Sequence, residues 1–154
     1  MPQAEAQAFI RDAERGSWRN AVEARFPEGD DMRISILDLQ RASWLPLLGL
    51  DAGAVALDIG SGLGAITHSL ACSLGTVYSV EAIPERIEFT QVRLQQEGLQ
   101  NVHLVQASAL ALPFFDASFD LIVINGILEW VGEWDLEGTP RQAQLRFLRQ
   151  AVKL

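Results

Sequence analysis

The fold of this chain is decided by one stretch, Leu57-Asp58-Ile59-Gly60-Ser61-Gly62-Leu63-Gly64. It places a glycine at every second position directly after an apolar run that starts at Ala54. An apolar run that ends in such a loop is typical of a buried parallel strand that turns into a helix. Glycine has no Cβ, so the backbone takes unusual φ and ψ there and lets a ligand approach its amides. Since the next helix N-terminus favours negative groups, the loop predicts a nucleotide-like or zwitterionic ligand.

Downstream of this loop, strand and helix patterns alternate along the chain. We expect strands over residues 54–59, 76–81, 102–106 and 119–125, and helices over 64–74, 84–97 and from about 140 onward. The last helix is expected to turn Leu145, Leu148 and Val152 to one side. Such alternation predicts an α/β fold, with a parallel sheet that has helices on both faces. In these sheets the ligand lies at the carboxyl ends of the strands, near the topological switch point.

The residues before Gly49 have helical rather than strand patterns. Helices are expected over residues 4–14, 18–26 and 31–48, the last from the helical spacing of Ile34, Leu37, the Arg41 stem, Leu45 and Leu48. The sequence therefore predicts an N-terminal helical segment over residues 1–50 and a sheet domain over 51–154.

Length, charge and cysteine content exclude several classes of protein. The 154 residues, 49% of them hydrophobic, suffice for a domain with a real core. A net charge of −8 argues against a nucleic-acid partner, so we expect the C-terminal bases to form a solvated helix face: Arg141, Arg146, Arg149 and Lys153. No apolar run approaches the ~18 residues of a membrane span. The single cysteine, Cys72, leaves no internal disulfide or cysteine-based zinc site and is expected in the core. Together these features predict a cytoplasmic protein without a metal.

Two acids flank the glycine loop. Glu81 ends the second expected strand, roughly 20 positions after Gly60, where a carboxylate can accept both ribose hydroxyls of an adenosine. Gly60, Gly62 and Ala65 also satisfy the G-x-G-x-x-G/A pattern of dinucleotide enzymes. Asp58 argues against a dinucleotide ligand, because a carboxylate there repels a pyrophosphate and favours an ammonium or sulfonium group.

These motifs resemble those of the class I S-adenosylmethionine-dependent methyltransferases. Asp58 to Gly64 resembles motif I of that family, an acid followed by x-G-x-G-x-G. Tyr78-Ser79-Val80-Glu81 resembles its acidic ribose motif. The segments 106–114, 119–125 and 126–131 resemble, in turn, the family's segment after the third strand, its fourth strand, and the loop and short helix after that strand. The resemblance covers about residues 50–154. It implies a Rossmann-like fold, S-adenosylmethionine as the cofactor and transferase activity.

The resemblance also implies a set of cofactor-binding residues: Asp58, Gly60, Ser61, Gly62, Gly64, Glu81, Ala82, Ile83, Ser108, Ala109 and Asn125. Ala82 and Ile83 would flank the adenine. The family often has Asp at the position of Ser108. The serine hydroxyl accepts a hydrogen bond from the adenine amino group more weakly than a carboxylate, or Ser108 only ends a strand. Asn125 would orient an acceptor or bond the cofactor. No catalytic residue is assigned, and Glu129 is either near the acceptor or solvated.

The family has a fifth strand and an antiparallel sixth–seventh pair after the helix that closes this sequence. We therefore expect those C-terminal strands to be missing and the fourth strand to form an open apolar edge. The remainder of a longer protein would cover that edge, or a second copy would do so in a homo-oligomer. Asn125 is not followed by Pro-Pro-aromatic, which argues against nucleic-acid amino groups as acceptors.

The leading hypothesis is methyl transfer to a small-molecule or sugar-like acceptor. The alternatives are an NAD(P)-dependent oxidoreductase and a non-catalytic cofactor-binding or assembly module. Two roles are open for the four tryptophans. Either Trp130 and Trp134 line an acceptor pocket and Trp18 and Trp44 belong to a lid over it, or all four pack the helices against the sheet. We expect structural roles for His68 and His103.

Overall fold

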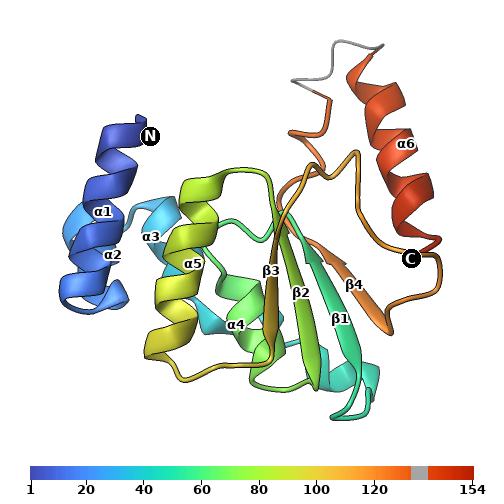
Figure 1. The fold of residues 1–154 in the computed structure, drawn as a ribbon, viewed down its shortest axis with the longest axis horizontal. Coiled ribbons are helices and arrows are strands. Elements are labelled where there is room, and N and C mark those ends of the chain that lie inside the picture. Colours follow the sequence, from blue (N-terminus) through green and yellow to red (C-terminus); the bar gives the residue numbers. More distant parts are fainter. Residues whose placement is uncertain (133–138) are drawn as a thin grey trace.

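A parallel sheet forms the centre of the computed structural model, which describes residues 1–132 and 139–154 (Figure 1). Its strands are β1 (Val55–Ile59), β2 (Thr76–Glu81), β3 (Val102–Gln106) and β4 (Leu121–Ile124). They lie in the order β3-β2-β1-β4, with every pair parallel. The chain leaves β1 for β2 on one side and reaches β4 on the other, so β1 and β4 flank the switch point. The predicted α/β architecture is confirmed.

Helices cover both faces of this sheet. They are α4 (Ala65–Ala71), α5 (Pro84–Gln96) and α6 (Pro140–Ala151). Because side chains alternate along a strand, Leu57 packs in one core cluster with Phe147 of α6, and Ala56 packs in another with Leu70 of α4. Asp58 shares the strand face of Ala56, which directs it toward α4.

The boundaries of α4 and β4 differ from those expected. α4 ends at Ala71, and Cys72 follows it as an exposed residue, so the expected burial of Cys72 is wrong. β4 begins at Leu121 because the amide of Phe119 donates to the Leu154 carbonyl at 3.1 Å instead of joining the ladder.

The face of α6 that packs on the sheet is formed by Ala143, Phe147 and Ala151, which are buried. Of the three residues expected on one side of the helix, Leu148 is partly buried against this cluster, whereas Leu145 and Val152 are 45% and 87% exposed. The small alanines one turn on either side of Phe147 allow a close approach to the sheet, and this decides the face.

The N-terminal segment consists of short helices. They are α1 (Gln3–Arg15), α2 (Trp18–Arg25), α3 (Asp31–Leu37), and the 3₁₀ turns η1 (Leu39–Ala42) and η2 (Leu45–Leu48). The single helix expected over residues 31–48 is wrong. Asp38 has an extended backbone, and its side chain accepts a hydrogen bond from the Gln40 amide at 2.8 Å, which ends α3 and begins η1. Ile34 and Leu48, both expected on the buried face, are exposed.

The first helices pack against the outer side of α5 (Figure 1). Phe9 of α1 stacks on Phe89 of α5 with ring centroids 4.6 Å apart, and Trp18 of α2 is only 2% exposed in the same cluster. This cluster is separate from the two that line the sheet. Among the described residues, no helix combines the length and apolarity needed to cross a bilayer.

Candidate functional site

The candidate site lies at the carboxyl ends of β1, β2 and β4. The register pairs Ile59 with Val80 on one side and with Ile124 on the other. The residues that come directly after these pairs are Gly60, Glu81 and Asn125, so parallel pairing brings them to one edge of the sheet. We call this edge the mouth; it consists of the glycine loop 60–64 with Asp58, Glu81 and Asn125.

The glycine loop needs glycine at its alternate positions. Gly60, Gly62 and Gly64 have φ values of 75°, 59° and 75°, in the left-handed region that other residues rarely adopt. A Cβ on Gly60 would lie 2.1 Å from Cγ2 of Ile127. The amides of Gly60 and Ser61 donate to the Val80 carbonyl at 2.8 and 3.0 Å, which ties the start of the loop to β2.

Glu81 is held against the loop by hydrogen bonds. Its side chain is 6% exposed, and Oε2 accepts from the Gly62 amide at 2.9 Å. Oε1 accepts from the amides of Ala82 and Ile83 at 2.9 and 3.0 Å, and Nη1 of Arg86 lies 3.6 Å from Oε2. The carboxylate is therefore oriented in advance beside the loop, where it can accept hydrogen bonds from the hydroxyls of a ligand.

Asp58 is buried beneath the loop. Its Oδ2 accepts from the Thr67 hydroxyl of α4 at 2.6 Å, and its side chain is 2% exposed. Burial raises the pKa of Asp58 to about 6, and the negative charge of Glu81 acts in the same direction. The hydrogen bonds from Thr67 and the charge of Arg41 oppose this rise. The two acids thus share one electrostatic environment, but Asp58 faces α4 and not the open side where an ammonium group is expected.

Arg41 is a residue of the mouth that the sequence does not reveal. Its Nη2 donates to Oδ1 of Asn125 at 2.8 Å, and its Nη1 donates to both the carbonyl and the hydroxyl of Ser35. In the sequence analysis Arg41 contributes only its apolar stem to the single helix expected over residues 31–48, and that helix does not form as one. An arginine inside an apolar stripe is the one signal that could have pointed to it.

The remaining expected cofactor residues lie around Glu81. Ala82 and Ile83 are exposed directly beyond it, with Ile83 at 41%. The amide of Ala107 donates to the Glu81 carbonyl at 3.1 Å, which brings the end of β3, and with it Ser108 and Ala109, beside β2. Oγ of Ser108 accepts from the Leu110 amide at 3.2 Å, within the segment that follows β3.

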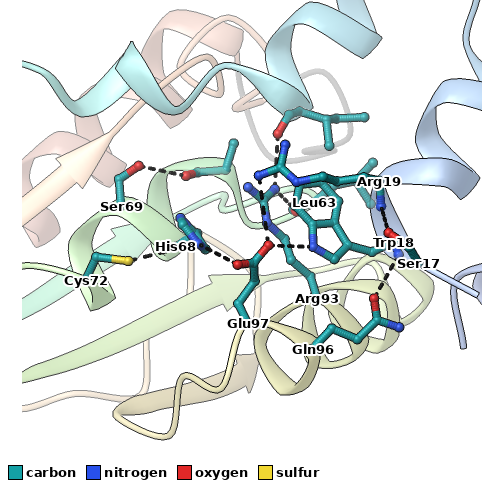
Figure 2. Close-up of polar contacts among 12 residues, drawn as sticks. Ser17, Trp18, Arg19, Leu63, His68, Ser69, Cys72, Arg93, Gln96 and Glu97 are labelled. Atoms are coloured by element: carbon teal, nitrogen blue, oxygen red, sulfur yellow. Dashed lines mark hydrogen bonds and ion pairs between the residues drawn. The ribbon is translucent and has the colours of Figure 1, made fainter.

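Other residues considered from the sequence lie elsewhere. His103 stacks on Tyr78 at 4.8 Å, and His68 lies in the cluster shown in Figure 2. Trp130 is 58% exposed and Glu129 is also exposed, whereas Trp134 lies outside the described residues. Within residues 1–132 and 139–154, no group of three or more His, Cys, Asp or Glu side chains is arranged to hold a metal ion.

Comparison with known proteins gives consistent matches. A family model described as a methyltransferase domain matches residues 50–151. Demethylmenaquinone methyltransferase of Lactococcus lactis is 32% identical over 91 residues, which are 57% of this chain and 36% of that protein. The chain thus spans about a third of the length of this curated relative.

Solved structures agree with that match. The YcgJ protein of Bacillus subtilis has a TM-score of 0.50 and 31% identity, with coverage of 53% of this chain and 35% of that one. A SAM-dependent methyltransferase of Aquifex aeolicus has a TM-score of 0.62 over 88% of this chain and 65% of that one. At 21% identity, the second structure supports the fold alone.

Proposed function

This chain belongs to the methyltransferase family whose model matches residues 50–151, and we propose that it binds S-adenosylmethionine and transfers the methyl group to a small-molecule or sugar-like acceptor. The observation that carries the proposal is the pairing of Glu81 with the Gly62 amide across the glycine loop. A carboxylate fixed at this position is suited to the two hydroxyls of a ribose.

The shape of the loop supports a ligand in front of Gly62. A Cβ on Gly62 would meet nothing within 4 Å, whereas a Cβ on Gly60 or Gly64 would lie 2.1 or 2.6 Å from a protein side chain. The middle of the loop therefore faces open space and its two ends face protein. Exposed Ala82 and Ile83 beside Glu81 offer an apolar surface for an adenine.

The charges of the mouth suit a zwitterionic sulfonium. The carboxylates of Asp58 and Glu81 favour a positively charged ligand, and burial strengthens this preference because the local dielectric is low. Arg41, bonded to Asn125, supplies the opposite charge on the β4 side, where it complements the carboxylate of the cofactor. The mouth and Arg41 would thus both contribute to binding the cofactor.

The chain contributes orientation and not reactivity. The cofactor, when bound, supplies the activated methyl group for an in-line displacement. Glu81 and the loop fix one end of the mouth, and the Asn125 amide orients an acceptor from the end of β4. The acidic net charge of −8 supports a small acceptor over a polyanionic one.

Calorimetry with S-adenosylhomocysteine, the demethylated product, tests the proposal. We expect the wild-type chain to bind it and Glu81→Ala to weaken binding about 100-fold, or ~2.7 kcal/mol, because charged hydrogen bonds to the ribose are lost. Glu88→Ala is the matched control, since Glu88 accepts a hydrogen bond from Gln7 on the exposed side of α5. Equal affinity in the two variants would contradict the assignment. Methyl transfer from labelled cofactor to a panel of small acceptors then identifies the substrate class.

The NAD(P)-dependent alternative rests on Gly60, Gly62 and Ala65. Membership in a methyltransferase family argues against it, and so does the buried Asp58 beneath the loop, whose charge would repel a pyrophosphate. A fluorescence titration with NADH is expected to show no binding; saturable binding would restore this alternative.

The edge of β4 supports a proposal about assembly. Among the described residues, β4 pairs with β1 alone, so its other edge is unpaired. We propose that this edge takes a further strand, from the rest of a longer protein or from a second copy. Light scattering that gives a strict monomer with methyl-transfer activity would exclude both a homo-oligomer and a purely non-catalytic assembly role. A cytoplasmic location is also a proposal, supported by the single cysteine.

A further inference from the structure

Arg93 is a charged residue of α5 that is fully buried. Removing a guanidinium from water is costly unless its charge and its donors are compensated. Burial is the main reason that the pKa of Arg93 falls to about 10, and the charge of Glu97 opposes this fall, so the side chain stays cationic at neutral pH. An apolar residue would fill this position at lower cost. The contacts that Arg93 makes therefore explain its presence better than packing alone.

One nitrogen of Arg93 joins two distant segments. Its Nη1 donates to the Leu63 carbonyl of the glycine loop at 3.1 Å and to the Ile36 carbonyl of α3 at 3.2 Å. Ile36 lies in the last turn of α3, where carbonyls have no partner within the helix. The bond to Leu63 is visible in Figure 2. Arg93 thus connects the cofactor loop with the N-terminal segment.

The same face of α5 holds the carbonyl side of the loop. Thr90, one turn before Arg93, donates from Oγ1 to the Gly62 carbonyl at 3.4 Å. A Cβ on Gly64 would lie 2.6 Å from Cγ2 of Thr90, so the loop is packed directly on this helix. The loop is thus held at two carbonyls by α5, while the Gly62 amide donates to Glu81.

The N-terminal helices hold Arg93 from the other side. The guanidinium carbon lies 4.1 Å from the centroid of the Trp18 ring, within the range of a cation–π contact. Trp18 donates from Nε1 to Glu97 at 2.8 Å and from its amide to Gln96 at 2.8 Å (Figure 2). Within the described residues, Nε and Nη2 of Arg93 have no hydrogen-bond partner, so the ring and the Glu97 charge are their compensation.

We propose that Arg93 is a positioning residue that couples the glycine loop to the N-terminal helices, so that cofactor binding and docking of α1–α3 stabilise each other. The inference rests on the proposed function. If one donor serves both Leu63 and Ile36, displacement of either segment disturbs the other. A ligand that fixes the loop must then raise the protection of α1–α3, and the reverse holds by linkage.

The test combines calorimetry with hydrogen–deuterium exchange, using S-adenosylhomocysteine as the probe. In the wild type we expect the probe to slow exchange in residues 3–37 by threefold or more. In Arg93→Met we expect at least tenfold weaker binding and no such slowing. In Arg93→Lys we expect partial recovery of both, because an ammonium can donate to the two carbonyls but lacks the planar stack on Trp18.

Leu74→Ala is the matched control. Leu74 is buried in a cluster that contains no residue of α1–α3, so its truncation lowers stability without loosening the docking of these helices and without removing a bond to the loop. We expect unchanged affinity and unchanged slowing of exchange in this variant. Should Arg93→Met fail to fold, Arg93→Lys and Trp18→Phe give the comparison, with Trp18→Phe removing the bond to Glu97 and reducing the coupling.

The outcomes separate the two proposals. A wild-type chain that does not bind the probe overturns the proposed function and this inference with it. A wild type that binds, but without slower exchange in residues 3–37, overturns the inference alone. The same holds if the Arg93 variants bind the probe as tightly as Leu74→Ala does.

Discussion

The mouth and the cluster around Arg93 both bury charge, but they balance it in different ways. At the mouth, burial raises the pKa of Asp58 to about 6, and the negative charge of Glu81 adds to this rise. In the cluster, Arg93 lies against the face of Trp18, and Glu97 accepts a hydrogen bond from that same ring. In the first region the charge of buried Asp58 is only partly compensated, although Arg86 lies 3.6 Å from Glu81, whereas in the second Arg93 is compensated by Trp18 and Glu97.

This difference separates binding from stability. A buried charge that is only partly compensated lowers stability, and a ligand of opposite charge reduces this cost. A compensated cluster gains nothing from a ligand and contributes to holding the helices in place. Removal of a buried carboxylate at the mouth should therefore weaken binding without lowering stability, whereas substitutions in the cluster should lower stability, and Arg93 should affect both.

The largest effect is expected for Trp18→Ala. Truncation of a buried tryptophan leaves a cavity and removes the bond to Glu97, so we expect a loss of about 3–5 kcal/mol in the free energy of unfolding, measured by urea titration. Trp44→Ala is the comparison, since Trp44 is only partly buried and should cost less. A loss below about 1 kcal/mol for Trp18→Ala would show that the cluster does not hold the helices.

A gain in stability is expected for Asp58→Asn. The folded-state pKa of about 6 lies above the ordinary value of 3.8, so the folded chain binds more protons than the unfolded chain between these pH values. Wild-type stability therefore includes a contribution that is present below pH 3.8 and is lost as pH rises through about 6. Asparagine can still accept from Thr67 and does not titrate.

The measurement for Asp58→Asn is a pair of urea titrations of each protein at pH 4 and pH 8. The variant should be more stable than the wild type by roughly 3 kcal/mol at pH 8 and by little at pH 4. Its affinity for S-adenosylhomocysteine should nevertheless fall, because the mouth loses negative charge. A variant that is less stable than the wild type at pH 8 would remove the contrast between the two regions.

The smallest effects are expected within the loop, where its two sides can be compared. Gly64→Ala meets both a positive φ and Thr90, and we expect a cost of about 2 kcal/mol, partly restored by adding Thr90→Ala. Gly62→Ala has the same kind of φ but an open surrounding, so it should cost about 1 kcal/mol and mainly weaken cofactor binding. If the two changes have equal effects on stability and on binding, the positions that face protein and the position that faces open space do not differ in function.

Local sequence patterns determined the strands, the loop and the position of Glu81. A short apolar run, alternating glycines and an acid at the end of the next strand can be recognised from neighbouring residues alone, because strand parity and the missing Cβ are local properties. Parallel pairing then brings Gly60, Glu81 and Asn125 to one edge with no further information. The helices α1 and α2 were predictable for the same reason, from their local helical patterns.

Tertiary packing alone decided which polar side chains act together. Arg41 meets Asn125, and Arg93 meets both Leu63 and Ile36, across long separations in the sequence that no local period encodes. Arg93 lies in a charged helix, where a guanidinium is ordinarily solvated; it is buried because α1 and α2 cover that side of α5. Likewise, the alternation of side chains along β1 determined which face of the sheet Asp58 lies on. Its burial and its raised pKa result from how closely α4 packs against that face. Such outcomes depend on how closely whole elements approach one another, and that distance results from the sum of many side-chain contacts.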